Sequence, residues 1–196
     1  GNVLLHAANA IALFFLLRRI FQVTLAGNDQ SAATATDLKT SLSWFAFLGA
    51  LLFALHPVAV YGVAYRIQRS ILMATLFVLL MLLAYLHGLL HNSWRWMLIA
   101  ALCYFAAVYS KEHSIMAPGV ALALTFLIRK PTLQLLKLVS PFFILATLSA
   151  FTVLLSAKGI LGATYEPRAE LLLEQASIAQ GISNLPNLHW LSILSQ

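Results

Sequence analysis

Two polar clusters interrupt the apolar stretches of this chain, and both have side chains that could bind an anion. In the first, Arg66 and Arg69 stand three residues apart, shortly after His56-Pro57 ends an apolar stretch. On a helix this spacing places both guanidinium groups on one face. Each guanidinium offers a planar fork of donors, so two of them at a membrane surface would form a phosphate clamp. The alternative is that both side chains only extend to water or to lipid head groups.

The second cluster is Lys111-Glu112-His113, between two short apolar stretches. Here Lys111 could bind a phosphate, and His113 could transfer protons. Glu112 could orient an arginine or hold a divalent metal ion. The alternative is a pair of opposite charges that only ends two helices.

Two histidine-containing pairs have spacings that need an interpretation. His6 and Asn9 stand three residues apart, and we favour hydrogen bonds to a neighbouring helix over the lining of a cavity. His87 and His91 stand four residues apart, a spacing found in metal sites, but no adjacent side chain supplies a third ligand. We interpret them as interfacial residues. Apart from the ion that Glu112 could hold, we predict no cofactor and no metal site.

The composition indicates which kind of element must position these residues. The chain has 196 residues, of which 61% are hydrophobic and 9% are charged. Soluble domains carry about 25% charged residues, so this chain cannot cover a water-exposed surface. The single Cys103 excludes an internal disulfide, and there is no motif of nucleotide binding, soluble hydrolases or nucleic-acid binding. We therefore predict an integral membrane protein.

The expected fold is an all-α, polytopic transmembrane helical bundle of about six spans. A span needs about 20 mostly apolar residues, and the fourth and fifth stretches are short for this length. The transmembrane region is predicted to cover 1–165, and 166–196 is predicted to form an amphipathic outer helix or loop that leads to a further span. The predicted cores are about 3–22, 43–58, 69–90, 95–110, 114–129 and 138–157.

Lys and Arg residues are unequally divided between alternate loops. One side, formed by 18–42, 91–95 and 129–137, carries seven of them against two Asp, a formal charge of +5. The other side carries five against four Glu, which gives +1. Cytoplasmic loops are enriched in Lys and Arg, so the first side is predicted to face the cytoplasm. Both polar clusters then lie on the outer side.

Two stretches resemble a known family. The run LFALHPVAVYGVAYRIQRSILMATLF, followed by YSKEHSIMAPGVALAL, is similar to the polytopic GT-C glycosyltransferases that use polyprenyl-phosphate-linked sugars. The likeness is to bacterial relatives of protein O-mannosyltransferases and of transmembrane, tetratricopeptide-repeat mannosyltransferases. In that family an HP motif ends a span, an outer loop continues to a QRS- or GRA-like turn, and a later outer loop carries a Lys-Glu pair.

The resemblance implies transfer of a hexosyl or pentosyl group from a polyprenyl phosphate to a protein or glycan acceptor, with no nucleic acid involved. It places the reaction on the periplasmic face of a bacterial inner membrane. It assigns the catalytic carboxylate to an outer loop that would precede Gly1, and this chain has Tyr61-Gly62 where relatives often have an acidic residue. The residues that it implies for binding the lipid phosphate and sugar are His56, Arg66, Arg69, Lys111 and Glu112.

Two other functions remain as alternatives. A transporter would use the outer charges as a substrate vestibule, but transporters place ionisable residues near the middle of spans. No Asp, Glu, Lys or Arg lies there in this sequence. A non-catalytic membrane anchor of a repeat protein would use the same charges only for contacts with lipid head groups.

A cysteine introduced at Gln68 tests the predicted topology. Because this region is predicted to lie outside, Gln68→Cys should react with an impermeant thiol reagent added to intact cells. The unsubstituted chain is the control, since Cys103 lies within an apolar stretch and should remain unlabelled. Labelling of Gln68→Cys only from the cytoplasmic face would reverse the orientation.

Overall fold

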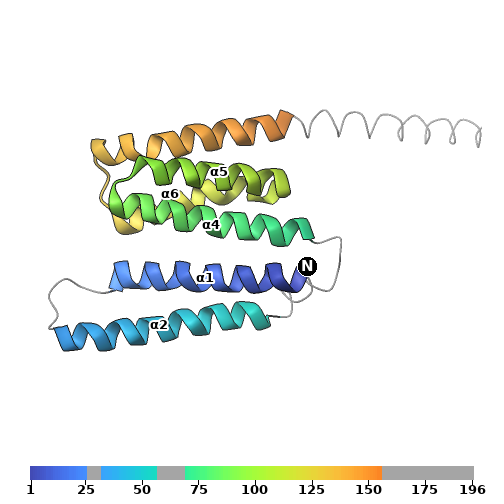
Figure 1. Cartoon of the computed structure of the whole chain (residues 1–196). Helices are drawn as coiled ribbons and strands as arrows, with labels where there is room; N and C mark the ends of the chain where they lie inside the picture. The colour runs from blue at the N-terminus through green and yellow to red at the C-terminus, as the bar shows by residue number, and fades with distance from the viewer. Residues whose placement is uncertain (26–31, 57–68, 156–196) are drawn as a thin grey trace, which may run out of the picture. The chain divides into compact units, whose positions relative to one another are not determined.

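The computed structural model describes residues 1–25, 32–56 and 69–155, without the side chains of 32–36. This part of the chain is helical and contains no strand, which confirms the all-α prediction for these residues. Nearly all of it belongs to one compact unit, Gly1–Val153. The elements are α1 (Asn2–Leu25), α2 (Ala32–Leu55), α4 (Arg69–His91), α5 (Trp94–Ser110), the 3-10 helix η2 (Glu112–Met116), α6 (Ala117–Ile128) and a last helix, Leu133–Leu155 (Figure 1).

Four of these helices are long and apolar enough to cross a membrane. They are Asn2–Leu25, Asp37–Leu55, Arg69–His91 and Leu133–Leu155. The apolar helices Trp94–Ser110 and Glu112–Ile128 are shorter. At 1.5 Å per residue, a helix of 17 residues extends roughly 25 Å, less than the ~30 Å hydrocarbon core of a bilayer. The four long helices indicate a membrane protein, and the count of six spans stays a prediction.

Two helices begin earlier than the sequence analysis predicted. The stretch 18–42 was assigned to a connection between spans, but α2 already begins at Ala32. Alanine has the highest intrinsic helix propensity, and this stretch contains no glycine or proline to stop a helix. The last helix begins at Leu133 instead of 138. In both cases the helix is longer than its apolar stretch, because the apolar stretch predicts only the part of the helix that can lie in a membrane.

The break between α5 and α6 is sharp. Lys111 has an extended backbone, with φ −161° and ψ 132°, and its N–H donates to Ala107 O at the end of α5. One turn of 3-10 helix follows, and α6 begins at Ala117 with Pro118 in its first turn. Proline suits this position because its missing N–H would have no partner inside the helix. The break therefore holds Lys111 and its neighbours at the ends of two helices.

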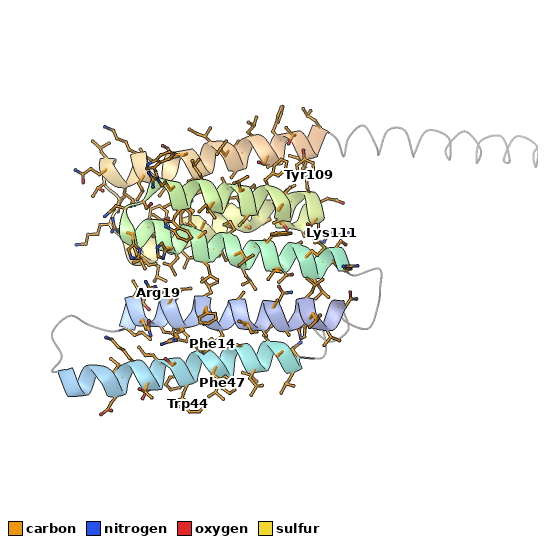
Figure 2. All side chains as sticks on the ribbon, in the orientation of Figure 1. Phe14, Arg19, Trp44, Phe47, Tyr109 and Lys111 are labelled. Carbon is orange, nitrogen blue, oxygen red and sulfur yellow. The ribbon has the colours of Figure 1, made fainter. Side chains whose placement is uncertain are left out.

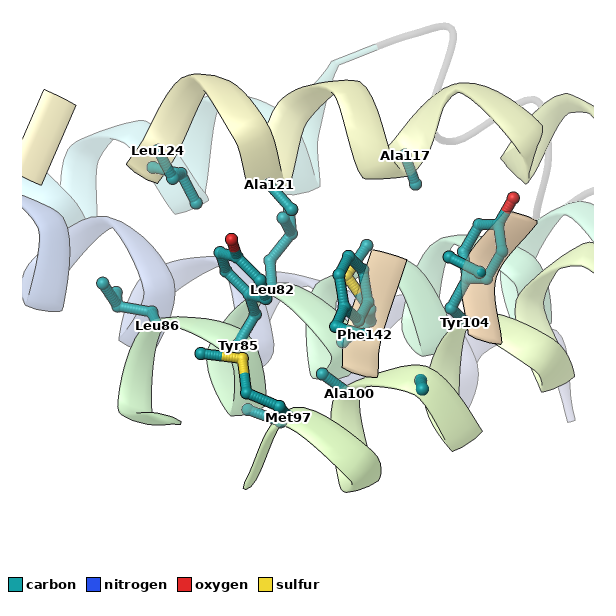
Figure 3. Close-up of a cluster of buried hydrophobic side chains, with 14 of the residues drawn as sticks. Leu82, Tyr85, Leu86, Met97, Ala100, Tyr104, Ala117, Ala121, Leu124 and Phe142 are labelled. Carbon is teal, nitrogen blue, oxygen red and sulfur yellow. The ribbon is translucent and has the colours of Figure 1, made fainter. Parts of the chain in front are cut away.

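The core forms where α4, α5, α6 and the last helix meet. Tyr85, Tyr104 and Phe142 are fully buried there, with ring centroids 4.9 Å apart for Tyr85 and Phe142 and 6.4 Å apart for Tyr104 and Phe142 (Figure 3). The Tyr85 hydroxyl donates to Thr125 Oγ1 at 2.6 Å, and Thr125 Oγ1 donates to Ala121 O at 3.0 Å. The hydroxyl groups that enter this apolar core are thus hydrogen-bonded.

Large apolar side chains also cover the outward faces of the helices. On α2, Trp44, Phe45, Leu52 and Leu55 are each more than 60% exposed. An apolar surface of this kind is unfavourable in water, whereas lipid tails solvate it at no cost. The exposed faces therefore agree with the apolar lengths of the helices in indicating a membrane environment.

Gly88 allows α4 and α5 to approach closely near their connecting turn. A Cβ atom at this position would lie 3.1 Å from Trp96 Cβ, 3.2 Å from Met97 Cε and 3.2 Å from Ser93 O. The first and last of these atoms have little freedom to move. A side chain here would therefore press against α5. The backbone φ of Gly88 is not positive, so the close contact between the helices, and not the backbone conformation, favours glycine at this position.

Gly88→Ala should lower the thermal stability of the protein in detergent. Overpacking of this kind costs roughly 1–3 kcal/mol, whereas replacing glycine in a helix gains about 1 kcal/mol or less. Gly119→Ala is the control, since a Cβ there meets no atom within 4 Å. Differential scanning fluorimetry should show a lower midpoint for Gly88→Ala only. Equal midpoints for the two variants would contradict the close contact.

Candidate functional site

Within Gly1–Val153, successive helices alternate in direction and their ends meet at two levels (Figure 1). At one level, α1 begins beside the end of α2 and the beginning of α4, as the contacts of His6 with Ala54 and Asn9 with Leu72 show. We call this level the Lys111 end. At the other level, Arg129 after α6 contacts the end of α4, and we call this the Arg19 end. Figure 2 labels Lys111 and Arg19 at their respective ends.

A groove of about 330 Å³ opens at the Lys111 end, between the first turns of α4 and the region from Lys111 to the start of α6. Apolar side chains form most of its walls, and its polar side chains come from Thr75 and from the break after α5. A ligand with a charged group and an apolar part would match this lining. The lining residues are Ile71, Ala74, Thr75, Val78, Lys111, His113, Ser114, Met116, Ala117 and Val120.

The break after α5 supplies the titratable groups of the groove. Lys111 is half-buried and His113 is exposed, and both side chains line the groove. Glu112 lies between them in sequence, but its exposed carboxylate does not line the groove. The ion pair of Lys111 with Glu112, given above as the alternative to a binding role, is not formed in the structure. The ammonium group of Lys111 is thus not neutralised by its neighbouring carboxylate.

The other predicted binding residues lie at different positions around the Lys111 end. Arg69 is the exposed first residue of α4, two residues before the groove wall at Ile71. His56 follows the end of α2, and α1 lies between α2 and α4 (Figure 1). Arg66 is outside the described residues, and so is the predicted outer segment 166–196. Of the predicted binding residues, Lys111 therefore lines the groove. Arg69 precedes the lining residue Ile71 by two positions, and His56 does not line the groove.

Two residues that the sequence analysis did not select hold the break in place. Tyr104 is fully buried, and its hydroxyl donates to Ile115 O in η2 at 3.3 Å. Ser114 is 7% exposed, and its N–H donates to Lys111 O at 3.1 Å. The sequence offers one signal for the role of Tyr104. A tyrosine inside an apolar stretch is expected to be buried, and a buried hydroxyl needs a hydrogen-bond partner. The residues around Tyr104 do not indicate which carbonyl group its hydroxyl contacts.

Helix α1 connects the two helix ends that flank 57–68. His6 Nε2 donates to Ala54 O of α2 at 3.0 Å, and Asn9 Nδ2 donates to Leu72 O of α4 at 3.1 Å. Asn9 is fully buried. This confirms that the His6 and Asn9 pair bonds to neighbouring helices. The remaining atoms of the pair, His6 Nδ1 and Asn9 Oδ1, are buried and have no partner among the described residues, so both can accept a further hydrogen bond.

Metal binding has no further support from the described residues. Among them, no group of three or more His, Cys, Asp or Glu side chains is placed to hold an ion. The divalent ion that Glu112 could bind stays a prediction.

Comparison of the chain with protein-family models, curated protein sequences and solved structures finds no match.

Asn9→Leu should destabilise the contact between α1 and α4. A leucine has a similar volume but cannot donate to Leu72 O, and hydrogen bonds between membrane helices contribute about 0.6 kcal/mol on average and ~1.7 at most. Thermal unfolding in detergent should therefore begin a few degrees lower. Thr24→Val is the control, because Thr24 Oγ1 donates only to Ile20 O within the same helix. An unchanged midpoint for Asn9→Leu would show that the bond contributes nothing.

Proposed function

We propose that this chain is part of a membrane glycosyltransferase of the GT-C type. In this proposal it transfers a sugar from a polyprenyl phosphate to a protein or glycan at the outer face of a bacterial inner membrane. The observation that carries the proposal is the groove at the Lys111 end, where Lys111 and His113 adjoin apolar walls from α4 and α6. A polyprenyl phosphate has the same division, with a dianionic or monoanionic head and an apolar tail. The resemblance of the HP, QRS and Lys-Glu motifs to that family supports the same substrate class.

The electrostatics of the groove suit such a reaction. When the sugar leaves its phosphate, negative charge develops on the phosphate oxygens. A cation that is fixed nearby stabilises this charge more strongly in the transition state than in the ground state. The defined backbone of Lys111 in the break after α5 supports this role for its side chain. Arg69 would add a second cation from the first turn of α4.

The other predicted residues have narrower roles in this proposal. His56 and Arg66 would bind the sugar or phosphate from the segment that joins α2 to α4. Glu112 would orient an arginine or hold a divalent ion outside the groove. We assign the catalytic base to no residue of this chain, since neither described carboxylate, Asp37 or Glu112, lines the groove.

Arg69→Ala should lower the rate of sugar transfer by the full-length protein by about 10²-fold or more, the usual cost of removing a group that stabilises developing charge. Lys111→Ala should have a similar effect, and Lys111→Arg should keep part of the activity because the charge remains. The measurement is transfer from polyprenyl-phosphate-linked sugars in membranes that contain equal amounts of each variant. Arg95→Ala is the matched control, because Arg95 is an exposed arginine on the first turn of α5, at the other end.

Full activity of both alanine variants would overturn the roles of Arg69 and Lys111. The membrane-anchor alternative would be favoured if the unsubstituted protein inserted normally into the membrane but transferred no sugar from any polyprenyl-linked donor.

A further inference from the structure

The Arg19 end contains a cluster that the proposed function does not use. His87 and His91, on the last turn of α4, stack with ring centroids 4.1 Å apart and planes 20° apart. Trp96 of α5 packs against His87 with centroids 4.4 Å apart. His91 Nδ1 donates to His87 O at 3.0 Å, so the orientation of the second ring is fixed by its own helix. The two imidazoles therefore form one stacked aromatic pair beside the α4–α5 turn.

Two arginines from other parts of the fold lie at the same end of α4. Arg19 of α1 is close enough to act electrostatically on His87, and Figure 2 shows it near the end of α1. Arg129, after α6, donates to Asn92 Oδ1 at 2.6 Å and to Leu90 O at 3.4 Å. These acceptors are neutral, so they hold the Arg129 guanidinium in place without compensating its charge.

The described residues provide no adequate counter-charge for this cluster. Their two acidic side chains are Asp37 and Glu112. Glu112 belongs to the Lys111 end, and Asp37 is an exposed residue of α2, which packs on α1. Neither forms an ion pair with Arg19 or Arg129 in the described part of the chain. Like charges that are brought together repel one another unless an anion lies between them.

We propose that the cluster of Arg19, His87, His91 and Arg129 binds the phosphate of an anionic phospholipid. Guanidinium groups bind phosphate oxygens with two parallel hydrogen bonds, and His87 adds an imidazole N–H donor, since the Nδ1–H of His91 already donates to His87 O. Basic pockets between membrane helices are suited to the head groups of anionic lipids.

The surroundings of the cluster favour a lipid over a free phosphate ion. Trp94 and Trp96, on the first turn of α5, are 58% and 38% exposed, as is common for tryptophans at the level of lipid head groups. Phe15 lies one turn before Arg19 on α1 and is 50% exposed. Acyl chains that descend from a phosphate at this cluster would contact such side chains. A free phosphate would gain nothing from them.

The arrangement also argues against the metal site that the spacing of His87 and His91 would allow. The two rings are stacked face to face, which directs their nitrogen lone pairs alongside each other and not toward a common point. A guanidinium near His87 would repel a cation. An anionic ligand is therefore the better match.

Titration with phosphatidylglycerol tests the proposal on the full-length protein in mild detergent. At a concentration about a hundred times Kd, the lipid should raise the thermal unfolding midpoint by roughly 5–10 °C. Phosphatidylcholine and inorganic phosphate at equal ionic strength should leave the midpoint unchanged. Arg19→Gln should lose most of the rise. Lys39→Gln should keep it, because Lys39 is an exposed cation on α2 and its substitution changes the net charge equally.

His87→Phe provides a second variant that preserves the ring stack, and it should weaken lipid binding several-fold. If Arg19→Gln does not fold, native mass spectrometry of the unsubstituted protein and of His87→Phe decides the question by the fraction that retains phosphatidylglycerol. Equal effects of the two phospholipids would overturn the proposal. So would a full rise in Arg19→Gln, an equal loss in Lys39→Gln, or stabilisation by inorganic phosphate alone. Because the cluster lies at the Arg19 end, none of these outcomes depends on the proposed glycosyl transfer.

Discussion

Close packing around α4 determines most of what the described part of the protein can do. This helix contacts α1, α5 and α6, and its Tyr85 also packs against Phe142 of the last helix. A polar group that enters such apolar contacts is stabilised by a partner within the protein. The Tyr85 and Thr125 hydroxyls have such partners in each other and in a backbone carbonyl. The packing of α4 therefore positions Arg69 at its beginning and His87 and His91 at its end.

The two ends of α4 present different chemistry. At its beginning, the helix provides one wall of an apolar groove whose opposite side carries Lys111 and His113. At its end, His87 and His91 form a stacked pair, and Arg129 donates to Asn92 Oδ1 and Leu90 O nearby. A phosphate could be bound at either end, but the neighbouring groups differ. The groove can enclose part of a ligand, whereas the histidine pair lies at the level of exposed tryptophans and suits a lipid of the membrane itself.

Much of the fold could be predicted because it follows from local composition. Each of the six apolar stretches overlaps a helix, and the two that were judged short are the two short apolar helices. The spacing of His6 and Asn9 predicted a contact between helices, and the structure confirms it. The start of α2 at Ala32 was missed because a polar stretch was interpreted as a connection. Polarity argues against a membrane span, but it does not argue against a helix.

The sequence by itself determined the membrane character and the helical class. It also identified Lys111-Glu112-His113 as a break between helices, since these properties depend on composition and on short-range spacing. Only the tertiary structure decided that Lys111 and His113 line a groove, that Glu112 does not, and that Tyr104 fixes Ile115. It also decided that Arg129 donates to Asn92 Oδ1 and Leu90 O at the end of α4, a helix far from Arg129 in sequence. Such contacts depend on how side chains of several helices fit together, and this fit is set by packing over the whole core.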